Sequence, residues 1–532
     1  MAPDAKRLKT EDAPPAGVVV CDNLIGGEST PPLSGTYLDV VSPSDGTVLG
    51  RVAMSGQKEV EVATARAEEA FVGWSGMTAK SRAAVMFRFH SLLEKHADEL
   101  AGLVVAENGK NKAEALASVA KGNETVEWAC SMPQLMQARE RATHMQRVSC
   151  AVLSLLGKIL QVSRGIECRD LREPLGVVAC LVVATVHLIE EGDINTALAG
   201  VLAERALGTC WMLALALSTH SPLFRRGYCG DIKLVPMLPL TIIVRWTVPI
   251  ALTAGNCVIL KPSEKVPLTM RKVGQLLGEA GLPPGVFQIV NGGREAAEAL
   301  CDAEAVKALT FVGSSGVAKS VAARCHAVNK RVLALGGAEN HLIALPDCEV
   351  IQKSKALEPG TEAGKVGPVI STASRDHIVG RIGAAEANGG EVLVDGRGWS
   401  ERKPGTWVGP TVIVKSRNGN KGDGKSEEIF GPVLMVVKVD TWQEALAVEN
   451  ASPFGNAASV YTSSGPAADY FQTRFRAGMI GVNVGIPVPR EPFAFGGLSG
   501  TLSKYGDFDV TAEGAMEFFT NRRKVGGGGG AS

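Results

Sequence analysis

Residues 256–293 of the chain read NCVILKPSEKVPLTMRKVGQLLGEAGLPPGVFQIVNGG. An apolar run ends in KPSE at 261–264, an amphipathic stretch follows until Gly281, and a second apolar run ends in NGG at 291–293. A short apolar run rich in β-branched residues predicts a buried strand, and apolar residues at a period near 3.6 predict a helix. The stretch is therefore expected to fold as strand, helix and strand, with both strands parallel in one sheet.

The same alternation continues to residue 345. It predicts strands over 256–260, 286–290, 308–312 and 331–335, and helices over 267–280, over 295–301 and from the GSSG at 313–316 to about 328. Strands and helices repeated in this order build a parallel α/β sheet, and such sheets bind nucleotides at the carboxyl ends of their strands.

Periodicity elsewhere predicts more of the same class of structure. It indicates helices over 58–70, 79–106, 111–136, 442–449 and 467–476, and strands over 388–394, 411–414 and 433–439. Residues 137–157 and 181–245 follow no steady period, which is unusual inside a compact domain.

Composition narrows the class of protein. A chain of 532 residues is expected to form two or three domains. Lys+Arg and Asp+Glu are equal at 55 each, which argues against a general nucleic-acid or anionic-membrane surface, and the apolar run 211–217 is too short to span a bilayer. The 11 cysteines form no CxxC pairs, so we expect reduced thiols in an intracellular protein and no zinc site.

The two ends of the chain read as tails. The first 20 residues contain KRLK at 6–9 but no apolar segment, so we expect no secretory signal and a solvated tail. The final GGGGGAS is expected to be flexible.

Several contiguous segments carry a resemblance to a known family. They are SRGIECRDLREPLGVVA (163–179), WTVPIALTAGNCVILKPSEKVPLT (246–269), ALGGAENH (334–341), GTEAGKVGPVIS (360–371), EIFGPVL (428–434) and NASPFGNAASVY (450–461). The chain resembles the aldehyde dehydrogenase superfamily, and within it the CoA-acylating methylmalonate-semialdehyde dehydrogenases. The resemblance implies an α/β fold with a Rossmann-type NAD domain, an α/β catalytic domain and a small oligomerisation β-hairpin.

The resemblance also implies a division of the chain. We expect a flexible N-terminal tail over 1–35, an NAD-binding domain over 36–345, a catalytic domain over 346–490, an oligomerisation or C-terminal arm over 491–524, and a flexible tail over 525–532. Residues 160–172 and 510–524 resemble the two arms of the hairpin, which predicts a homodimer or homotetramer.

The adenosine half of NAD is assigned by the resemblance to the strand ends of the 256–345 block. Lys261 and Glu264 match residues that bind the adenosine ribose, and a carboxylate at Glu264 would repel a 2′-phosphate, which favours NAD over NADP. Gly313 and Ser314 open a helix directly after a strand, where free amides and the helix dipole suit a pyrophosphate. Without the family context, KPSE and GSSG would each read as an ordinary turn.

The nicotinamide half is assigned to EIFGP. Glu428 and Phe430 match the family residues that contact the nicotinamide ribose and ring, although a turn phenylalanine in a small core would look the same. Asn483 and the segment 453–455 are expected to shape the far wall of the site.

The family's attacking group is not found. The family uses a cysteine thiolate, and an asparagine amide that stabilises the oxyanion. The flanks of the asparagine motif are present at 176–179 and 246–249, but residues 181–245 stand between them, and Asn195 has no matching neighbours. The cysteine segment is missing between residues 346 and 357, where Cys348 is expected to be non-catalytic.

Two further positions depart from the family. Ala334 stands where most members carry a glutamate that activates water, a departure that fits a CoA-dependent enzyme. Lys121 stands where a carboxylate-binding arginine is expected. Loss of a covalent nucleophile commonly lowers the rate by roughly 10⁴–10⁶, so we predict no catalytic residues and an inactive chain.

Three hypotheses remain open. In the first, the chain is a semialdehyde dehydrogenase by descent, and its sequence carries retained introns and a skipped exon. In the second, it is a catalytically dead scaffold that binds NAD. In the third, it is a structural protein that binds no nucleotide. The resemblance implies NAD as cofactor, CoA as co-substrate and a small aldehyde from valine or pyrimidine breakdown. It gives no role for nucleic acid or membrane, and it implies a mitochondrial or cytoplasmic location.

Overall fold

The structure, a computed structural model, describes residues 7–9, 18–135, 139–140, 158–163, 166–182, 240–345, 357–402, 404–415, 428–485, 487–506 and 508–528. Its centre is an eight-stranded sheet whose inner strands are parallel neighbours. In sheet order these are β12 Phe287–Ile289, β11 Cys257–Lys261, β10 Val177–Val182, β13 Val306–Val312 and β14 Arg331–Leu335. Short strands extend the edges, namely β21 Lys504–Tyr505 beside β14, and β3 Asn23–Ile25 and β4 Glu28–Thr30 beyond β12.

The order of these strands is one at which doubly wound sheets form a ligand crevice. The chain passes from β10 to β11 and β12 on one side and then to β13 and β14 on the other, so the order reverses at β10. Every residue of β10 and β11 is buried, as expected for strands covered on both faces. The carboxyl ends around such a reversal are where doubly wound sheets bind ligands.

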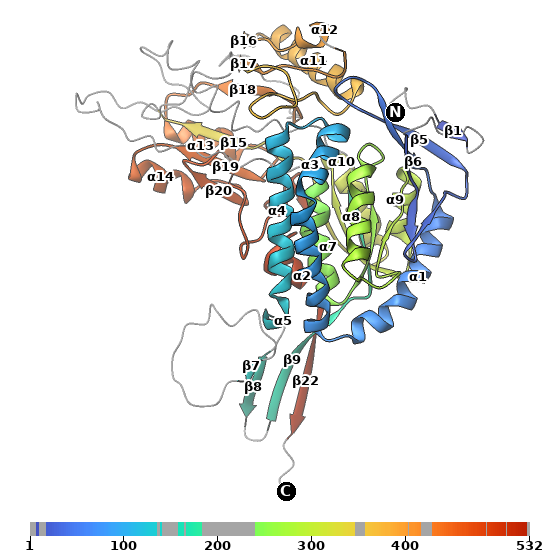
Figure 1. Cartoon of the computed structure of the whole chain (residues 1–532). Coiled ribbons are helices and arrows are strands. Elements are labelled where there is room, and N and C mark those ends of the chain that lie inside the picture. The colour runs from blue at the N-terminus through green and yellow to red at the C-terminus, as the bar shows by residue number, and fades with distance from the viewer. Residues whose placement is uncertain are drawn as a thin grey trace.

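Helices pack on this sheet or on the helices that cover it (Figure 1). They are α1 Gln57–Gly76, α2 Ala79–Lys95, α3 Ala97–Asn108, α4 Lys112–Cys130, α5 Met132–Leu135, α7 Leu240–Ala254, α8 Pro267–Glu279, α9 Arg294–Asp302 and α10 Ser315–Ala327. The strands and helices predicted between residues 256 and 335 are all present, with ends shifted by no more than two residues. The helix predicted over 79–106 is instead two helices that meet at His96, whose backbone leaves the helical region (φ −103°, ψ 17°).

The later part of the chain forms two smaller parallel and mixed sheets, drawn in yellow to red in Figure 1. One contains β15 His341–Ala344, β19 Ala457–Tyr461 and β20 Met479–Val482, packed by α13 Trp442–Asn450 and α14 Gly465–Gln472. The other contains β16 Glu391–Val394, β17 Thr411–Lys415 and β18 Val433–Val437, beside α11 Thr372–Ala387 and α12 Trp399–Arg402. Each sheet has its own buried cluster, so this half has cores separate from that of the eight-stranded sheet.

The flexible N-terminal tail predicted over 1–35 differs from the structure at residues 7–9 and from residue 18 onward, where strands form. Strands β2 Val19–Cys21, β5 Thr36–Val41 and β6 Val48–Ala53, together with β1 Arg7–Lys9, form a four-stranded sheet. Cys21 is fully buried in a cluster with residues of β5, β6 and α8. Three-residue strands have too little alternation to stand out in a sequence, and the contacts that hold them are distant along the chain.

A narrow sheet projects from the body and is called the arm here (Figure 1). It contains β9 Ile166–Pro174 between β22 Thr520–Gly528 and β8 Lys158–Ser163, with β7 Arg139–Glu140 at its far edge. The hairpin partner predicted over 510–524 is partly wrong, because α15 Ala512–Phe518 occupies its first half and β22 runs on to Gly528, into the predicted tail 525–532. Of the stretches predicted to be irregular, 137–157 and 181–245, the structure describes only residues 139–140, 181–182 and 240–245. The other residues of these stretches lie outside the described part of the chain.

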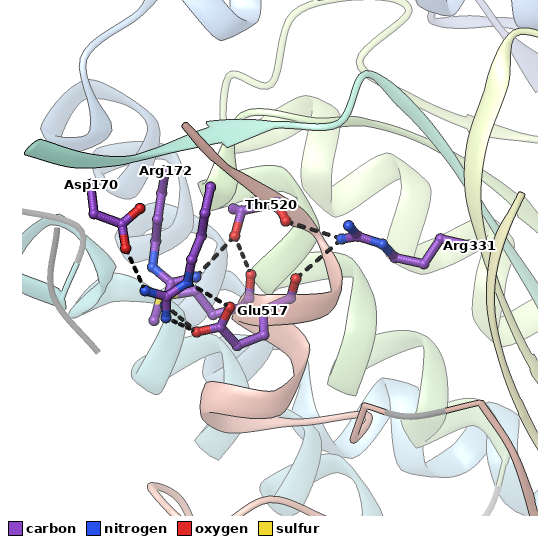
Figure 2. A network of polar contacts seen from close by, with 7 residues as sticks. Asp170, Arg172, Arg331, Glu517 and Thr520 are labelled. Carbon is purple, nitrogen blue, oxygen red and sulfur yellow. Dashed lines mark hydrogen bonds and ion pairs between the residues drawn. The ribbon is translucent and has the colours of Figure 1, made fainter. Parts of the chain in front are cut away.

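Charged side chains join the arm to α15 (Figure 2). Glu517 accepts hydrogen bonds from Arg172 of β9 and from Arg522 of β22, and Arg522 also pairs with Asp170 at 2.8 Å. Arg331 of β14 donates to the carbonyls of Phe518 and Thr520 at 2.6 and 3.0 Å. The base of the arm is therefore tied both to α15 and to the edge of the central sheet.

Among the helices formed by the described residues, we find none with the length and apolarity that crossing a bilayer requires.

Candidate cofactor and active site

The turn after β11 places two of the predicted residues at the crevice. Lys261 is the last residue of β11 and is buried, and its Nζ donates to the carbonyl of Pro262 at 2.7 Å. The Glu264 carboxylate lies 3.9 Å from Lys261 Nζ and is 32% exposed. Burial lowers the pKa of Lys261. A carboxylate that is partly exposed beside a buried ammonium group can accept hydrogen bonds from ribose hydroxyls and would repel a phosphate there.

The turn after β13 provides the expected helix start. Gly313 follows β13 and donates its amide to Leu335 O at 3.1 Å, and Ser314 is the N-cap of α10. The Ser314 hydroxyl makes no capping hydrogen bond and the residue is exposed. Helix geometry leaves the amides of the first turn without an acceptor inside the helix. The end of β13 is two strands from the end of β11, which corresponds to about 10 Å.

Glu428 lies next to the end of β14. Its Oε1 accepts hydrogen bonds from the amides of Ala338 and Glu339, at 3.0 and 3.4 Å. A side chain on Gly337 would meet Glu428 Oε2 at 2.5 Å and the Phe454 ring at 2.8 Å. Burial raises the pKa of Glu428, although its two backbone hydrogen bonds oppose the shift. Phe430, two residues on, is half-buried.

One residue that the sequence did not single out connects these parts. The Ser315 hydroxyl accepts from the amide of Gly337 at 2.8 Å and donates to Leu502 O at 2.9 Å. It therefore joins the first turn of α10 to the strand end that contacts Glu428. The structure brings Ser314 and Glu428 to the same region through Ser315 and Gly337. The adjacency of Ser315 to the GSSG turn was the only sequence signal for it.

Two other predicted positions have structural partners. Asn483 joins β19 to β20, because its amide group exchanges hydrogen bonds with the backbone of Thr462 at 2.9 Å each. Lys121 Nζ lies 2.8 Å from Glu124 and 2.9 Å from Glu491, and Glu491 also accepts from Thr125 at 2.8 Å. The charge of Lys121 is thus shared by two carboxylates of the protein itself.

Ala334 lies inside β14 and is fully buried. A methyl group at this position supplies no base, as the sequence indicates.

The cysteine side chains that the structure describes are all buried: Cys21, Cys130, Cys180, Cys257, Cys301 and Cys325. Burial raises the pKa of Cys21, Cys130 and Cys257 to about 12, and it also raises the pKa of Cys180. These groups are neutral thiols near pH 7 and therefore weak nucleophiles.

Cys325 differs, because a hydrogen bond with Cys301 lowers its pKa. It lies in the last turn of α10, about 16 Å along the helix from Ser314, which is too far to reach a substrate at the strand ends. Cys348 and Asn195 lie outside the described residues, so the absence of a nucleophile and of an oxyanion amide stays a prediction.

Comparison with known proteins agrees with the predicted family and fold. The profile of the aldehyde dehydrogenase family matches residues 30–183, 238–360 and 349–525, and the chain belongs to this family. It is by descent an oxidoreductase that acts on aldehydes. The matched segments leave out residues 184–237, which coincide with most of the predicted insertion.

The relatives narrow the resemblance. The chain is 31% identical over 552 residues to malonate-semialdehyde dehydrogenase 1 of Geobacillus kaustophilus, covering 95% of this chain and 97% of that one. It is 31% identical over 547 residues to the malonate-semialdehyde dehydrogenase of Listeria innocua, covering 94% and 96%. The crystal structure of methylmalonate-semialdehyde dehydrogenase from Oceanimonas doudoroffii superposes with a TM-score of 0.78 at 29% identity, over 97% of this chain and 99% of that chain. These comparisons confirm the predicted family and fold.

A second solved structure shares the fold. It is a putative methylmalonate-semialdehyde dehydrogenase from Sinorhizobium meliloti 1021 complexed with NAD, with a TM-score of 0.78 at 24% identity, over 97% of this chain and 99% of that chain.

Proposed function

We propose that this chain is an NAD-binding relative of the malonate- and methylmalonate-semialdehyde dehydrogenases that has lost the ability to turn over an aldehyde. The observation that carries the proposal is the arrangement at the strand ends. Glu264 after β11, the α10 N-terminus after β13 and Glu428 beside Gly337 after β14 lie past the carboxyl ends of strands in one parallel sheet. Each offers a group that one part of a dinucleotide requires, namely a ribose acceptor, pyrophosphate donors and a second ribose acceptor.

NAD would supply the hydride acceptor when bound, and the chain's own residues would hold it. Glu264 accepts from the adenosine ribose, the amides at 314–316 bind the pyrophosphate, and Glu428 and Phe430 orient the nicotinamide ribose and ring. Support for this comes from the family match and from the neighbour that was solved with NAD.

The loss of turnover rests on the connection after β15. Residues 346–356 are the whole link between that strand and the segment beginning at Leu357, and Cys348 is the only thiol in it. The sequence of this link contains no match to the Gly-Gln-Arg-Cys motif that the resemblance implies at this point. In an intact relative the acyl group would pass to CoA, which is the co-substrate that the resemblance implies.

Binding and turnover are tested separately on the purified full-length chain. We expect titration calorimetry to detect NAD binding, and we expect malonate semialdehyde with NAD and CoA to yield no NADH absorbance above the enzyme-free rate. Any NADH formation above the enzyme-free rate would contradict the proposed inactivity, and an active enzyme would typically turn over at roughly 10 s⁻¹. Absence of NAD binding would leave only a structural role for the fold.

The competing explanation is a sequence that does not represent the mature message. Sequencing of the transcript across codons 130–360 decides it: a message that restores Phe-Asn-Phe-Pro and Gly-Gln-Arg-Cys indicates an active semialdehyde dehydrogenase. A message identical to this chain supports the scaffold.

We further propose that the arm mediates self-association. Among the strands that the structure describes, β22 is at the edge of the arm, and an edge strand can pair with a second copy of the sheet. The expected state is a homodimer or homotetramer, measured by light scattering after size-exclusion chromatography, and a monomer would contradict it.

We likewise propose a division of the chain into domains. The NAD-binding domain would extend from about residue 18 to 345, since β3 pairs with β12, and the catalytic domain would cover 346–490. Within the proposed C-terminal arm 491–524, β21 pairs with β14 of the central sheet. For the compartment, the relatives described above are bacterial and give no support to a mitochondrial location or a role in valine breakdown, so these stay expectations from the resemblance.

A further inference from the structure

The first turn of α8 is held by a carboxylate from a distant helix. α8 begins at Pro267, and its N-cap residue Val266 makes no side-chain hydrogen bond. Glu107, in the last turn of α3, supplies the missing acceptors. Its Oε2 accepts from the Leu268 amide at 2.7 Å, and its Oε1 accepts from the Thr269 amide at 3.0 Å and from the Thr269 hydroxyl at 2.5 Å.

This contact is inaccessible to water and makes a complete cap. Glu107 is 1% exposed and Thr269 is fully buried. A carboxylate that accepts the amides of the first helical turn also interacts favourably with the positive end of the helix. The orientation of the α8 N-terminus therefore depends on Glu107 rather than on its own N-cap.

The turn that bears Lys261 and Glu264 joins β11 directly to this helix end. At one end it is fixed by the pairing of β11 with β10 and β12. Inside the turn, Ser263 accepts from the amides of Lys265 and Val266 at 3.2 and 3.3 Å. At the other end the chain enters α8, where Glu107 holds the next two amides. The five residues between β11 and α8 are fixed at both ends and have little freedom, so a shift at α8 would move Glu264.

We propose that Glu107 is a positioning residue for the dinucleotide, which sets the place of Glu264 and hence the affinity for the adenosine half of NAD. The inference rests on the proposed function and adds a residue that contacts no part of the nucleotide. The nicotinamide half depends on Glu428, which is held by Ala338 and Glu339, so Glu107 is expected to leave that half unaffected.

The body of α8 does not need this cap to stay folded. Met270, Val273, Leu276 and Leu277 are buried on its inner face and pack in the main core. Substitution at Glu107 is therefore expected to displace the first turn and the preceding loop while the helix remains.

The test compares ligand halves in matched variants of the full-length chain. The measurements are made at pH 8, above the pKa of Glu107, where its side chain is a carboxylate. In Glu107→Gln the amide nitrogen faces a backbone N–H, so one charged acceptor is lost. We expect the affinity for NAD and for AMP to fall about tenfold, the change that corresponds to one hydrogen bond to a charged group, with no change for nicotinamide mononucleotide. The control Glu279→Gln removes an exposed carboxylate from the other end of α8 and is expected to bind all three ligands as the unaltered chain does.

A second pair of variants covers the case in which Glu107→Gln does not fold. Thr269→Val removes only the hydroxyl and is expected to weaken AMP binding about threefold, which corresponds to about half of the free energy of one hydrogen bond. Thr269→Ser keeps the hydroxyl and is expected to bind AMP as the unaltered chain does. Unchanged AMP affinity in folded Glu107→Gln or in Thr269→Val, or an equal loss for AMP and nicotinamide mononucleotide, would overturn the inference alone. Failure of the unaltered chain to bind NAD would overturn the proposed function and this inference with it.

Discussion

Replacing Glu517 with glutamine tests the network that joins the arm to α15 (Figure 2). Glu517 accepts from both Arg172 and Arg522, and the Arg172 side chain is only 1% exposed. Removing one partner of a buried ion pair costs about 3–5 kcal/mol. Glu517 is 28% exposed and Arg172 keeps its 3.1 Å bond to Thr520, so water and that bond offset part of the loss. We expect the free energy of unfolding to fall by about 2 kcal/mol at pH 7.

The pH dependence of this loss follows from the pKa of Glu517. Burial alone would raise this pKa, but the hydrogen bonds from Arg522 and Arg172 outweigh burial and lower it to about 2. A carboxyl group with a depressed folded pKa contributes stability above its unfolded value, which is about 4.3 for glutamate, and loses it as pH falls toward the folded value. The difference between the two proteins should be constant above pH 5 and shrink below about pH 4.3.

Urea unfolding followed by circular dichroism, at pH 7, 5 and 3.5, measures this difference. Glu173→Gln is the matched control in the same arm, because Glu173 pairs with Arg523 at 2.8 Å while these side chains are 37% and 65% exposed. That exposed pair is expected to contribute no more than about 0.5 kcal/mol. Equal losses for Glu517→Gln and Glu173→Gln, or a loss for Glu517→Gln that stays the same at pH 3.5, would refute the reasoning.

Three further predictions concern the cofactor crevice and its support. Burial raises the pKa of Glu107 to about 7, so its favourable contribution is present below its unfolded pKa of about 4.3 and is lost as pH rises through 7. The unaltered chain should therefore lose about 3 kcal/mol relative to Glu107→Gln between pH 5 and 8 in urea unfolding, and parallel pH profiles would contradict this. The neighbouring Cys21, with a pKa of about 12, does not titrate in that range. Glu264→Ala should shift the ratio of NADP to NAD affinity by about tenfold toward NADP in calorimetry, since a carboxylate no longer repels the 2′-phosphate; an unchanged ratio would remove Glu264 from the site. Gly337→Ala should lower thermal stability by about 1–3 kcal/mol, because its Cβ would lie 2.5 Å from Glu428 Oε2. Gly316→Ala, which has nothing within 4 Å of the new Cβ, should not be destabilised, and equal effects of these two substitutions would refute the packing argument.

Local patterns predicted the elements of the central block well. The apolar run before KPSE forms β11. Pro267 is the first residue of α8, a position that suits proline because its φ is fixed near the helical value and it has no amide hydrogen to satisfy. These signals depend only on neighbours in the chain, such as periodicity, β-branching and turn residues. They failed where an element is short or is defined by a distant partner. The strand over 19–21 is one case, and the helix at 512–518 within the predicted hairpin arm is another.

The candidate site divides in the same way. Gly313, Ser314 and Glu428 were assigned from motifs that retain the family pattern. Two contacts could be found only in the folded chain: Ser315 joins Gly337 to α10, and Glu428 accepts from the amides after β14. The residues of the second contact are about 90 positions apart in the sequence. No local signal marked Glu107, because a lone glutamate near the end of one helix does not reveal which other helix it caps.

The amino-acid sequence by itself determined the family of this protein, the alternation of its central strands and helices, and the short link around Cys348 that lacks the expected nucleophile segment. Tertiary structure alone decided the strand order that reverses at β10, the junction of Ser315 with Gly337, and the capping of α8 by Glu107. The reason is physical: helix and strand propensities act between residues close along the chain, whereas buried hydrogen bonds and ion pairs form between groups that only the packed core brings together.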